Sequence, residues 1–321
     1  MSLASAFTSA ILPILSIMGV GYLLALRVDL DIEPLNVIAL YVFLPALIFH
    51  SLATTTLGGE TVFGIFGAVV AFVAVMAAIA EGTDRLFGVS EPFRSADVLA
   101  SAFPNAGFYG IPLAEFTFGP VGRTTASLYI VAQAILMYTL GVYIASRGGG
   151  RGGTNAIGEI FKLPLIYAIA AAAIVRALGV VPSASGTVMT TIELVGNASI
   201  PLMLAIVGVQ LAELERTVMT RVLPPTILKL AVAPVVGIGV ATVIAFENAA
   251  VARVFVLLCA TPVALIPLAL TITYSDDRSV SASTTEPAAS EYLTTIIFVT
   301  TLASVPVLTV LVTLLQSGML L

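Results

Sequence analysis

Residues 101–113 decide how the chain folds, and they read Ser-Ala-Phe-Pro-Asn-Ala-Gly-Phe-Tyr-Gly-Ile-Pro-Leu. They lie inside an apolar run long enough to cross a bilayer, yet two prolines and two glycines interrupt it. Pro104 and Pro112 lack the amide hydrogen of a helical residue, and their rings clash with the carbonyls of residues 100 and 108. The pattern therefore predicts a membrane helix that unwinds midway. Unpaired backbone groups at that depth need an interior environment, so we expect the break to face a cavity and a polar ligand.

The composition of the whole chain indicates a polytopic, all-α membrane protein. Of its 321 residues, 59% are hydrophobic and 10% are charged, and the mean hydropathy is +1.10. A soluble core cannot bury so much apolar surface. Residues 1–25 lack a basic start and a small-residue cleavage site, so we interpret them as a retained first span. The single cysteine, Cys259, excludes an internal disulfide and argues against cysteine-based metal or redox chemistry.

Ten stretches have the length and apolarity of a transmembrane helix. They are residues 7–26, 34–53, 61–80, 96–118, 124–145, 160–178, 188–212, 222–246, 254–274 and 292–315. A glycine-rich segment, 147–159, separates the fifth from the sixth. We therefore expect two five-helix repeats, residues 1–146 and 160–321, joined by this linker.

Short motifs recur between the two halves at nearly equal spacing. Phe-Leu-Pro-Ala-Leu at 43–47 matches Ser-Ile-Pro-Leu-Met at 199–203, an offset of 201 − 45 = 156. Ile-Pro-Leu occurs at 111–113 and at 266–268, an offset of 266 − 111 = 155. Because each half has an odd number of spans, the second copy enters the membrane inverted. The sequence thus predicts a 5+5 inverted repeat whose fourth and ninth helices are broken crossover helices.

Basic residues predict the orientation. The loops after the odd-numbered spans hold nine of them, namely Arg27, Arg85, Arg94, Arg147, Arg151, Lys162, Arg216, Arg221 and Arg278. The opposite loops hold three, Arg123, Arg176 and Arg253. Cytoplasmic loops carry the basic excess, so we expect the linker to be cytoplasmic and both termini to be outside a cell membrane.

Two polar residues inside the spans carry alternative interpretations. Asn105 can bind a ligand or can satisfy the carbonyl freed at Ala100, and its place in the break favours the ligand. Lys229 can extend to the membrane interface or can act as the charge partner of an anion, and interfacial extension is slightly favoured.

Other polar residues have simpler readings. Glu115 and Glu193 lie near the ends of spans and are expected to be interfacial, and His50, also near a span end, is expected to be packed or interfacial and not a proton carrier. Gln133, Tyr138 and Asn197 can line a cavity or join helices by hydrogen bonds. The sequence has no His-Glu-x-x-His, no Gly-x-Ser-x-Gly, no phosphate-binding loop and no cysteine and histidine cluster, so an enzyme is the weaker class. A passive channel stays open as a third class.

The motif at 103–113 resembles the auxin efflux carrier family, which includes PIN-like prokaryotic transporters. Phe-Leu-Pro-Ala-Leu at 43–47, Ala-Thr-Pro-Val-Ala-Leu at 260–265 and Tyr-Ser-Asp-Asp at 274–277 add to the resemblance. It implies a fold similar to that of bile-acid symporters, with spans one, two, six and seven as scaffold. Spans three to five and eight to ten would form a transport domain that moves like an elevator.

The resemblance also implies a function and a site. Members are commonly homodimers that carry small organic anions, such as auxin or mono- and dicarboxylates, and efflux by alternating access is expected. We expect no enzymatic activity, no cofactor, no metal and no nucleic acid; the coupling ion stays open. The expected substrate-binding residues at the two crossovers are Pro104, Asn105, Gly107, Tyr109, Pro112, Thr261, Pro262 and Pro267, with Lys229 as a candidate charge partner.

The second crossover departs from the first because it has neither asparagine nor glycine, leaving Thr261 as its side-chain donor. Residues 62–80 of span three contain no ionisable group, which removes one place for a coupling proton.

Overall fold

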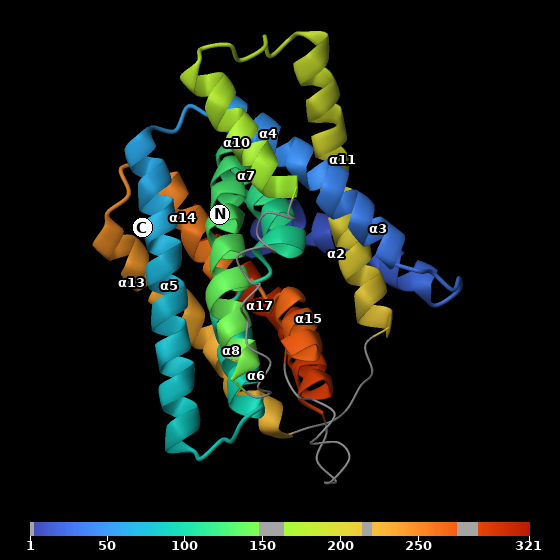
Figure 1. The fold of residues 1–321 in the computed structure, drawn as a ribbon, viewed down its shortest axis with the longest axis vertical. Coiled ribbons are helices and arrows are strands. Elements are labelled where there is room, and N and C mark those ends of the chain that lie inside the picture. The colour runs from blue at the N-terminus through green and yellow to red at the C-terminus, as the bar shows by residue number, and fades with distance from the viewer. Residues whose placement is uncertain (1–2, 148–163, 214–219, 275–287) are drawn as a thin grey trace.

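A computed structural model covers the chain and describes residues 3–147, 164–213, 220–274 and 288–321. The described residues form a bundle of helices without β-strands (Figure 1). The predicted linker, 147–159, lies outside the described residues from residue 148 onward, as does most of the predicted loop after residue 274.

The first half contains helices of very different length. They are α1 (Leu3–Ala6), η1 (Phe7–Ile11), α2 (Leu12–Ala25), α3 (Glu33–Ile38), η2 (Ala39–Phe43), α4 (Leu44–Thr54), α5 (Gly59–Leu86), α6 (Phe93–Ala102), η3 (Ala106–Gly110), α7 (Ile111–Leu136), η4 (Met137–Gly141) and α8 (Val142–Ser146). The second half contains α10 (Pro164–Ala177), α11 (Thr187–Glu213), η5 (Thr220–Val222), α12 (Leu223–Ile227), η6 (Leu228–Val232), α13 (Ala233–Ile244), α14 (Ala249–Cys259), α15 (Ile266–Tyr274) and α17 (Ala289–Gln316).

Seven helical segments of the described chain are long and apolar enough to cross a membrane. Two of the ten predicted spans, 96–118 and 254–274, are each divided into shorter helices. Residues 106–146 instead form one long segment that contains a kink. The kink is at Gly119, whose φ of 62° is a left-handed conformation that glycine tolerates. It separates the second part of predicted span four from predicted span five.

Wide helical turns precede four of the prolines. The π-helical turns η1, η2, η3 and η6 each end two residues before a proline, at Pro13, Pro45, Pro112 and Pro234. A proline ring collides with the carbonyl four residues back in an α-helix, and a wider turn removes that collision. Pro112 therefore lies in a continuous helix, and the predicted double break is a single break at residues 103–105.

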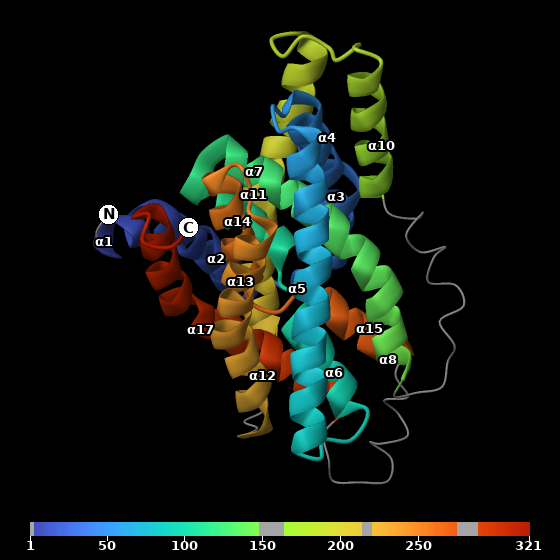
Figure 2. The ribbon, with the colours of Figure 1, turned by 90° about the vertical axis from the view of Figure 1, so that its left-hand side faces the viewer.

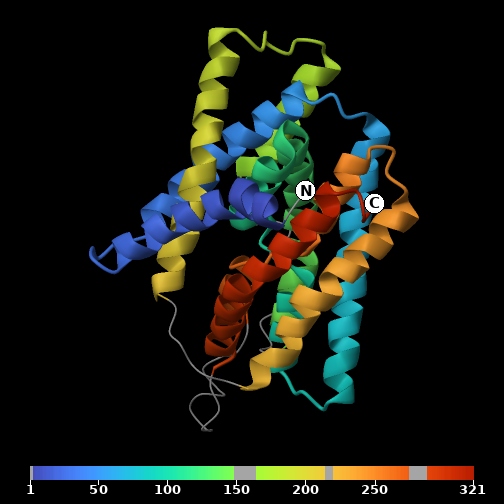
Figure 3. The same cartoon turned by 180° about the vertical axis from the view of Figure 1, so that it is seen from behind.

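One group of helices packs through glycine contacts. Helix α11 packs against α2 and α4, and α10 packs against α4 (Figure 3). At the α2–α11 crossing, a Cβ atom added to Gly208 would lie 2.0 Å from the carbonyl oxygen of Met18. A Cβ atom added to Gly21 would lie 2.1 Å from that of Ala205. The two backbones are in direct contact, as small residues allow in membrane bundles.

A second group surrounds the long helix α5. It packs against α6, α7 and α13, while α14 packs against α7 and α13 (Figure 2). The core of this group includes Phe72, Tyr129 and Phe255, which are fully buried and in aromatic contact. These contacts hold the interrupted helices in fixed positions.

Candidate functional site

The two interrupted helices meet at their interruptions. Pro104 and Val263 form an isolated antiparallel β-bridge. The amide of Asn105 donates to the carbonyl of Pro262 at 2.7 Å, and the amide of Ala264 donates to the carbonyl of Phe103 at 3.1 Å. The backbone groups released by the two breaks thus satisfy one another, as the interior of a membrane protein requires.

Asn105 is at the N-terminal end of η3, yet its side chain does not cap that helix. The side chain makes no hydrogen bond within the described residues, although the residue is only 7% exposed. Its backbone oxygen accepts from the amide of Gly110 at 2.9 Å. The alternative role predicted for it, satisfying the carbonyl of Ala100, is not seen. A buried side-chain amide is therefore free for a ligand.

Gln133 lies beside the same interruption and was expected either to line a cavity or to join helices. Its Nε2 donates to the carbonyl of Pro104 at 2.9 Å. Its Oε1 is buried without a partner. Gln133 thus joins helices with one end of its amide and offers an acceptor with the other.

A cavity of about 240 Å³ opens at the first interruption. Pro104, Asn105, Gly107 and Gln133 form its polar end. Its other walls are mostly apolar and come from both groups of helices: Leu40, Tyr41, Leu44, Phe108, Ile130, Met137, Tyr138, Leu165, Leu265 and Ile266. A cavity with apolar walls and a few convergent polar groups has the chemistry of a small-molecule site.

The other predicted site residues lie around this cavity but do not line it. Pro262 joins the backbone bridge through its carbonyl. Thr261 is buried, and its hydroxyl donates to the carbonyl of Leu258 at 2.8 Å. Tyr109 is fully buried in the core. Pro112 is the second residue of α7, which continues directly from η3, and Pro267 is the second residue of α15, which begins after the second interruption.

Lys229 does not extend to the membrane interface, so the favoured prediction for it was wrong. The residue is 0% exposed, and its Nζ donates to the carbonyl of Cys259 at 3.3 Å. Its ammonium also lies 5.8 Å from the centre of the Phe72 ring. Cys259 is the last residue of α14, so the amine of Lys229 lies at the C-terminal end of that helix, next to the second interruption. The sequence could not reveal this position because α14 supplies the partner.

A hydrogen-bonded network joins Glu115, Arg123 and Asn197. Arg123 donates to both carboxylate oxygens of Glu115, at 2.7 and 2.9 Å, and to Oδ1 of Asn197 at 2.7 Å. Asn197 therefore joins helices, one of its two predicted roles. His50 and Glu193 lie 4.0 Å apart, joining α4 to α11.

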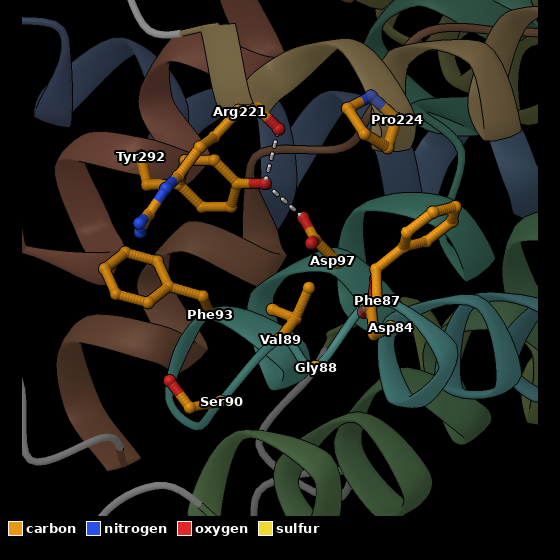
Figure 4. Close-up of a pocket in the computed structure, with 10 residues that line it drawn as sticks. All are labelled: Asp84, Phe87, Gly88, Val89, Ser90, Phe93, Asp97, Arg221, Pro224 and Tyr292. Carbon is orange, nitrogen blue, oxygen red and sulfur yellow. Dashed lines mark hydrogen bonds between the residues drawn. The ribbon is translucent and has the colours of Figure 1, made fainter.

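The sequence interpretation missed a second polar cavity. It lies where α5 and α6 meet α12 and α17, and it contains Asp84, Asp97 and Tyr292 (Figure 4). Helix α5 continues to Leu86, beyond the predicted end of span three at residue 80, and so carries Glu81 and Asp84. Acidic residues within or beside a predicted span were the available signal. Within the described residues, no group of three or more histidine, cysteine or acidic residues is arranged to hold a metal.

The fold and this site define a class, that of a multi-pass helical membrane protein with a small-molecule cavity at interrupted helices. A family model described as "Membrane transport protein" matches residues 6–159. A protein described as an uncharacterized transporter from Methanothermobacter thermautotrophicus is 26% identical over 255 residues, which cover 75% of this chain and 80% of the relative. These matches confirm the predicted resemblance, to a family of membrane transporters and not of enzymes.

Proposed function

We propose that the chain is a carrier that moves small organic anions by alternating access. The observation that carries the proposal is the buried, unbonded amide of Asn105, which lies where two interrupted helices meet and opens on a cavity. Discontinuous helices that meet in this way are typical of secondary transporters. A passive pore does not need such an arrangement.

Electrostatics at the first interruption favour an anion. A helix that begins at η3 directs its first amides and the positive end of its dipole toward the interruption. Asn105 adds a side-chain donor at the same point, and Gly107 brings the backbone to the cavity surface. The Asn105 donor and the helix amides suit a carboxylate, while the unpartnered Oε1 of Gln133 suits a donor group elsewhere on the same ligand.

The remaining walls favour one carboxylate attached to an apolar body. They are aliphatic and aromatic, and no basic side chain lines the cavity in the described residues. The second carboxylate of malate or malonate would face apolar groups, which is unfavourable. We therefore favour an auxin-like monocarboxylate over a dicarboxylate.

Two groups of helices supply the parts that alternating access needs. In the proposed ten-span inverted repeat, α2, α4, α10 and α11 form the scaffold, whereas α5–α8 and α12–α17 form the moving group. The cavity lies between them, because Leu40 and Leu44 come from the first group and Asn105 and Ile130 from the second. Movement of one group past the other would expose the cavity to either side. A homodimer and an efflux direction follow from the family resemblance alone.

Counterflow in liposomes tests the proposal. Purified protein is reconstituted in vesicles loaded with unlabelled indole-3-acetate, and the labelled compound is added outside. A carrier should accumulate label transiently above its equilibrium level, relative to protein-free vesicles. Simple equilibration of the label would indicate a channel, and chemical conversion of the label would indicate an enzyme.

Orientation can be tested on its own. A cysteine introduced between residues 148 and 153, in a Cys259→Ala background, should resist an impermeant thiol reagent added to intact cells. Labelling from outside would overturn the proposed cytoplasmic position of the linker.

A further inference from the structure

The second polar cavity, of about 280 Å³, contains two buried aspartates that the proposed carrier mechanism does not yet use. Asp84 and Asp97 are each 3% exposed. They come from α5 and α6, and Tyr292 of α17 and Arg221 of η5 complete the polar lining (Figure 4). Buried carboxyl groups in membrane proteins commonly mark ion and proton pathways.

The hydroxyl of Tyr292 faces two acceptors although it has a single hydrogen. Its oxygen lies 2.8 Å from Oδ1 of Asp97 and 3.1 Å from the backbone carbonyl of Arg221. Figure 4 shows both contacts converging on the hydroxyl. With Asp97 ionised, the hydroxyl can satisfy only one of the two at a time. With Asp97 protonated, the acid donates to the tyrosine oxygen while the tyrosine donates to the carbonyl. One added proton therefore completes the network.

Asp84 supplies the second buried carboxyl group of this cavity. Its Oδ2 is buried and makes no hydrogen bond. Glu81, one turn earlier on the same helix, lies within 4.0 Å of Arg85, Arg94 and Arg147. No ion pair of this kind joins Asp84 or Asp97 to a basic residue in the described part of the chain. The three arginines near Glu81 thus form ion pairs with Glu81 and not with the two buried aspartates.

The charged and titratable groups that act on the buried pair come from all the surrounding elements. Glu81, Glu91 and Arg94 act on Asp84 and Tyr292 acts on Asp97, while Arg221 acts on Tyr292. The guanidinium of Arg221 lies 6.0 Å from the centre of the Phe93 ring. Acidic neighbours and burial both disfavour two negative charges in this cavity, which favours a bound proton.

We propose that Asp97 and Asp84 form a proton-binding site that couples proton movement to transport. In the protonated state, the Tyr292 hydroxyl accepts a hydrogen bond from Asp97 and donates one to the backbone carbonyl of Arg221. The inference rests on the proposed carrier function. All lining helices belong to the proposed moving group, so the proton travels with the substrate site. Asp97 is on α6 and is six residues before Phe103, the residue that directly follows this helix, which places the aspartate about 9 Å from the interruption along the helix. A change in hydrogen bonding at Asp97 can therefore shift the helix that ends at the interruption.

Infrared spectroscopy of the full-length protein in detergent tests the site without any substrate. Wild type near neutral pH should show the carbonyl stretching band of a protonated carboxylic acid in a buried position, and Asp97→Asn should lack that band. Glu81→Gln is the matched control, because its carboxylate is already paired with arginines, and it should keep the band. A wild-type protein without the band, or a band unchanged in both Asp97→Asn and Asp84→Asn, would overturn the proposal.

Exchange of indole-3-acetate in vesicles with equal pH on both sides tests the coupling. The wild-type rate should change about fivefold between about pH 6 and about pH 8, and the Asp97→Asn rate less than about twofold. If exchange is absent in wild type while the infrared band is present, the carrier function fails and the proton site stands. A rate in wild type that depends on sodium at constant pH, and loses that dependence in Asp97→Asn, would show a metal cation site and overturn the proton assignment.

Discussion

At the first interruption a buried side-chain amide has no hydrogen bond, whereas at the second the nearby polar side chains each have one. Asn105 is unbonded, but Thr261 donates to the carbonyl of Leu258 and Lys229 to that of Cys259. Thr300 accepts from the amide of Val263 at 3.3 Å. The two breaks form one backbone bridge, yet the side-chain amide without any hydrogen bond belongs to the first. In the proposed carrier, the first interruption would therefore recognise the substrate and the second would support it.

The largest effect should follow from filling the cavity at the first interruption. Gly107→Leu places a bulky side chain in the cavity and should abolish indole-3-acetate binding and exchange. Gly107→Ala is the matched control, since its Cβ would lie 3.6 Å from Cδ1 of Ile130, an ordinary contact. Isothermal calorimetry and counterflow measure both variants. Full activity of Gly107→Leu would place the substrate elsewhere.

A smaller effect, on stability alone, is expected at Lys229. Lys229→Met removes the donor to the carbonyl of Cys259 and should lower the free energy of unfolding by about 1–3 kcal/mol. Affinity for indole-3-acetate should stay within about twofold, because Lys229 supports the second interruption and does not contact the ligand. A melting curve and a binding isotherm separate these effects. Loss of affinity with unchanged melting would make Lys229 the charge partner of the anion.

The smallest effect is expected at Thr261. Thr261→Val keeps the shape of the side chain and removes its hydrogen bond to Leu258, which should cost about 0.5–1.5 kcal/mol of stability. Counterflow of indole-3-acetate should be unchanged. A large loss of counterflow would show that the second interruption also recognises the substrate.

The parts of the fold that depend on local chemistry could be predicted from the sequence. Apolar length indicated the membrane helices, and Pro104 indicated the break at residues 103–105. The break attributed to Pro112 does not occur, because the wide turn η3 accommodates the proline. Such turns depend on how the chain relaxes around each ring, which spacing alone does not specify.

The parts that depend on distant partners could not be predicted. The position of Lys229 is determined by the end of α14, and the environment of Asp97 by Tyr292, which lies 195 residues later in the chain. Asn105 and Gln133 were identified from the sequence as polar residues in spans. Only the structure showed that Gln133 is anchored to Pro104 while the Asn105 amide is left unbonded.

The central claim, that the first interruption recognises the substrate, is tested most directly by comparing Asn105→Ala with Thr261→Val in one binding experiment. A hydrogen bond to a charged ligand contributes about 1.5–3 kcal/mol, so Asn105→Ala should weaken indole-3-acetate binding about 10- to 100-fold. Its melting temperature should match wild type, because the lost group bonds nothing in the protein. Thr261→Val should bind as wild type does. Normal binding by Asn105→Ala would contradict the account, and so would unfolding of that variant, which would assign the asparagine to repair of the broken helix.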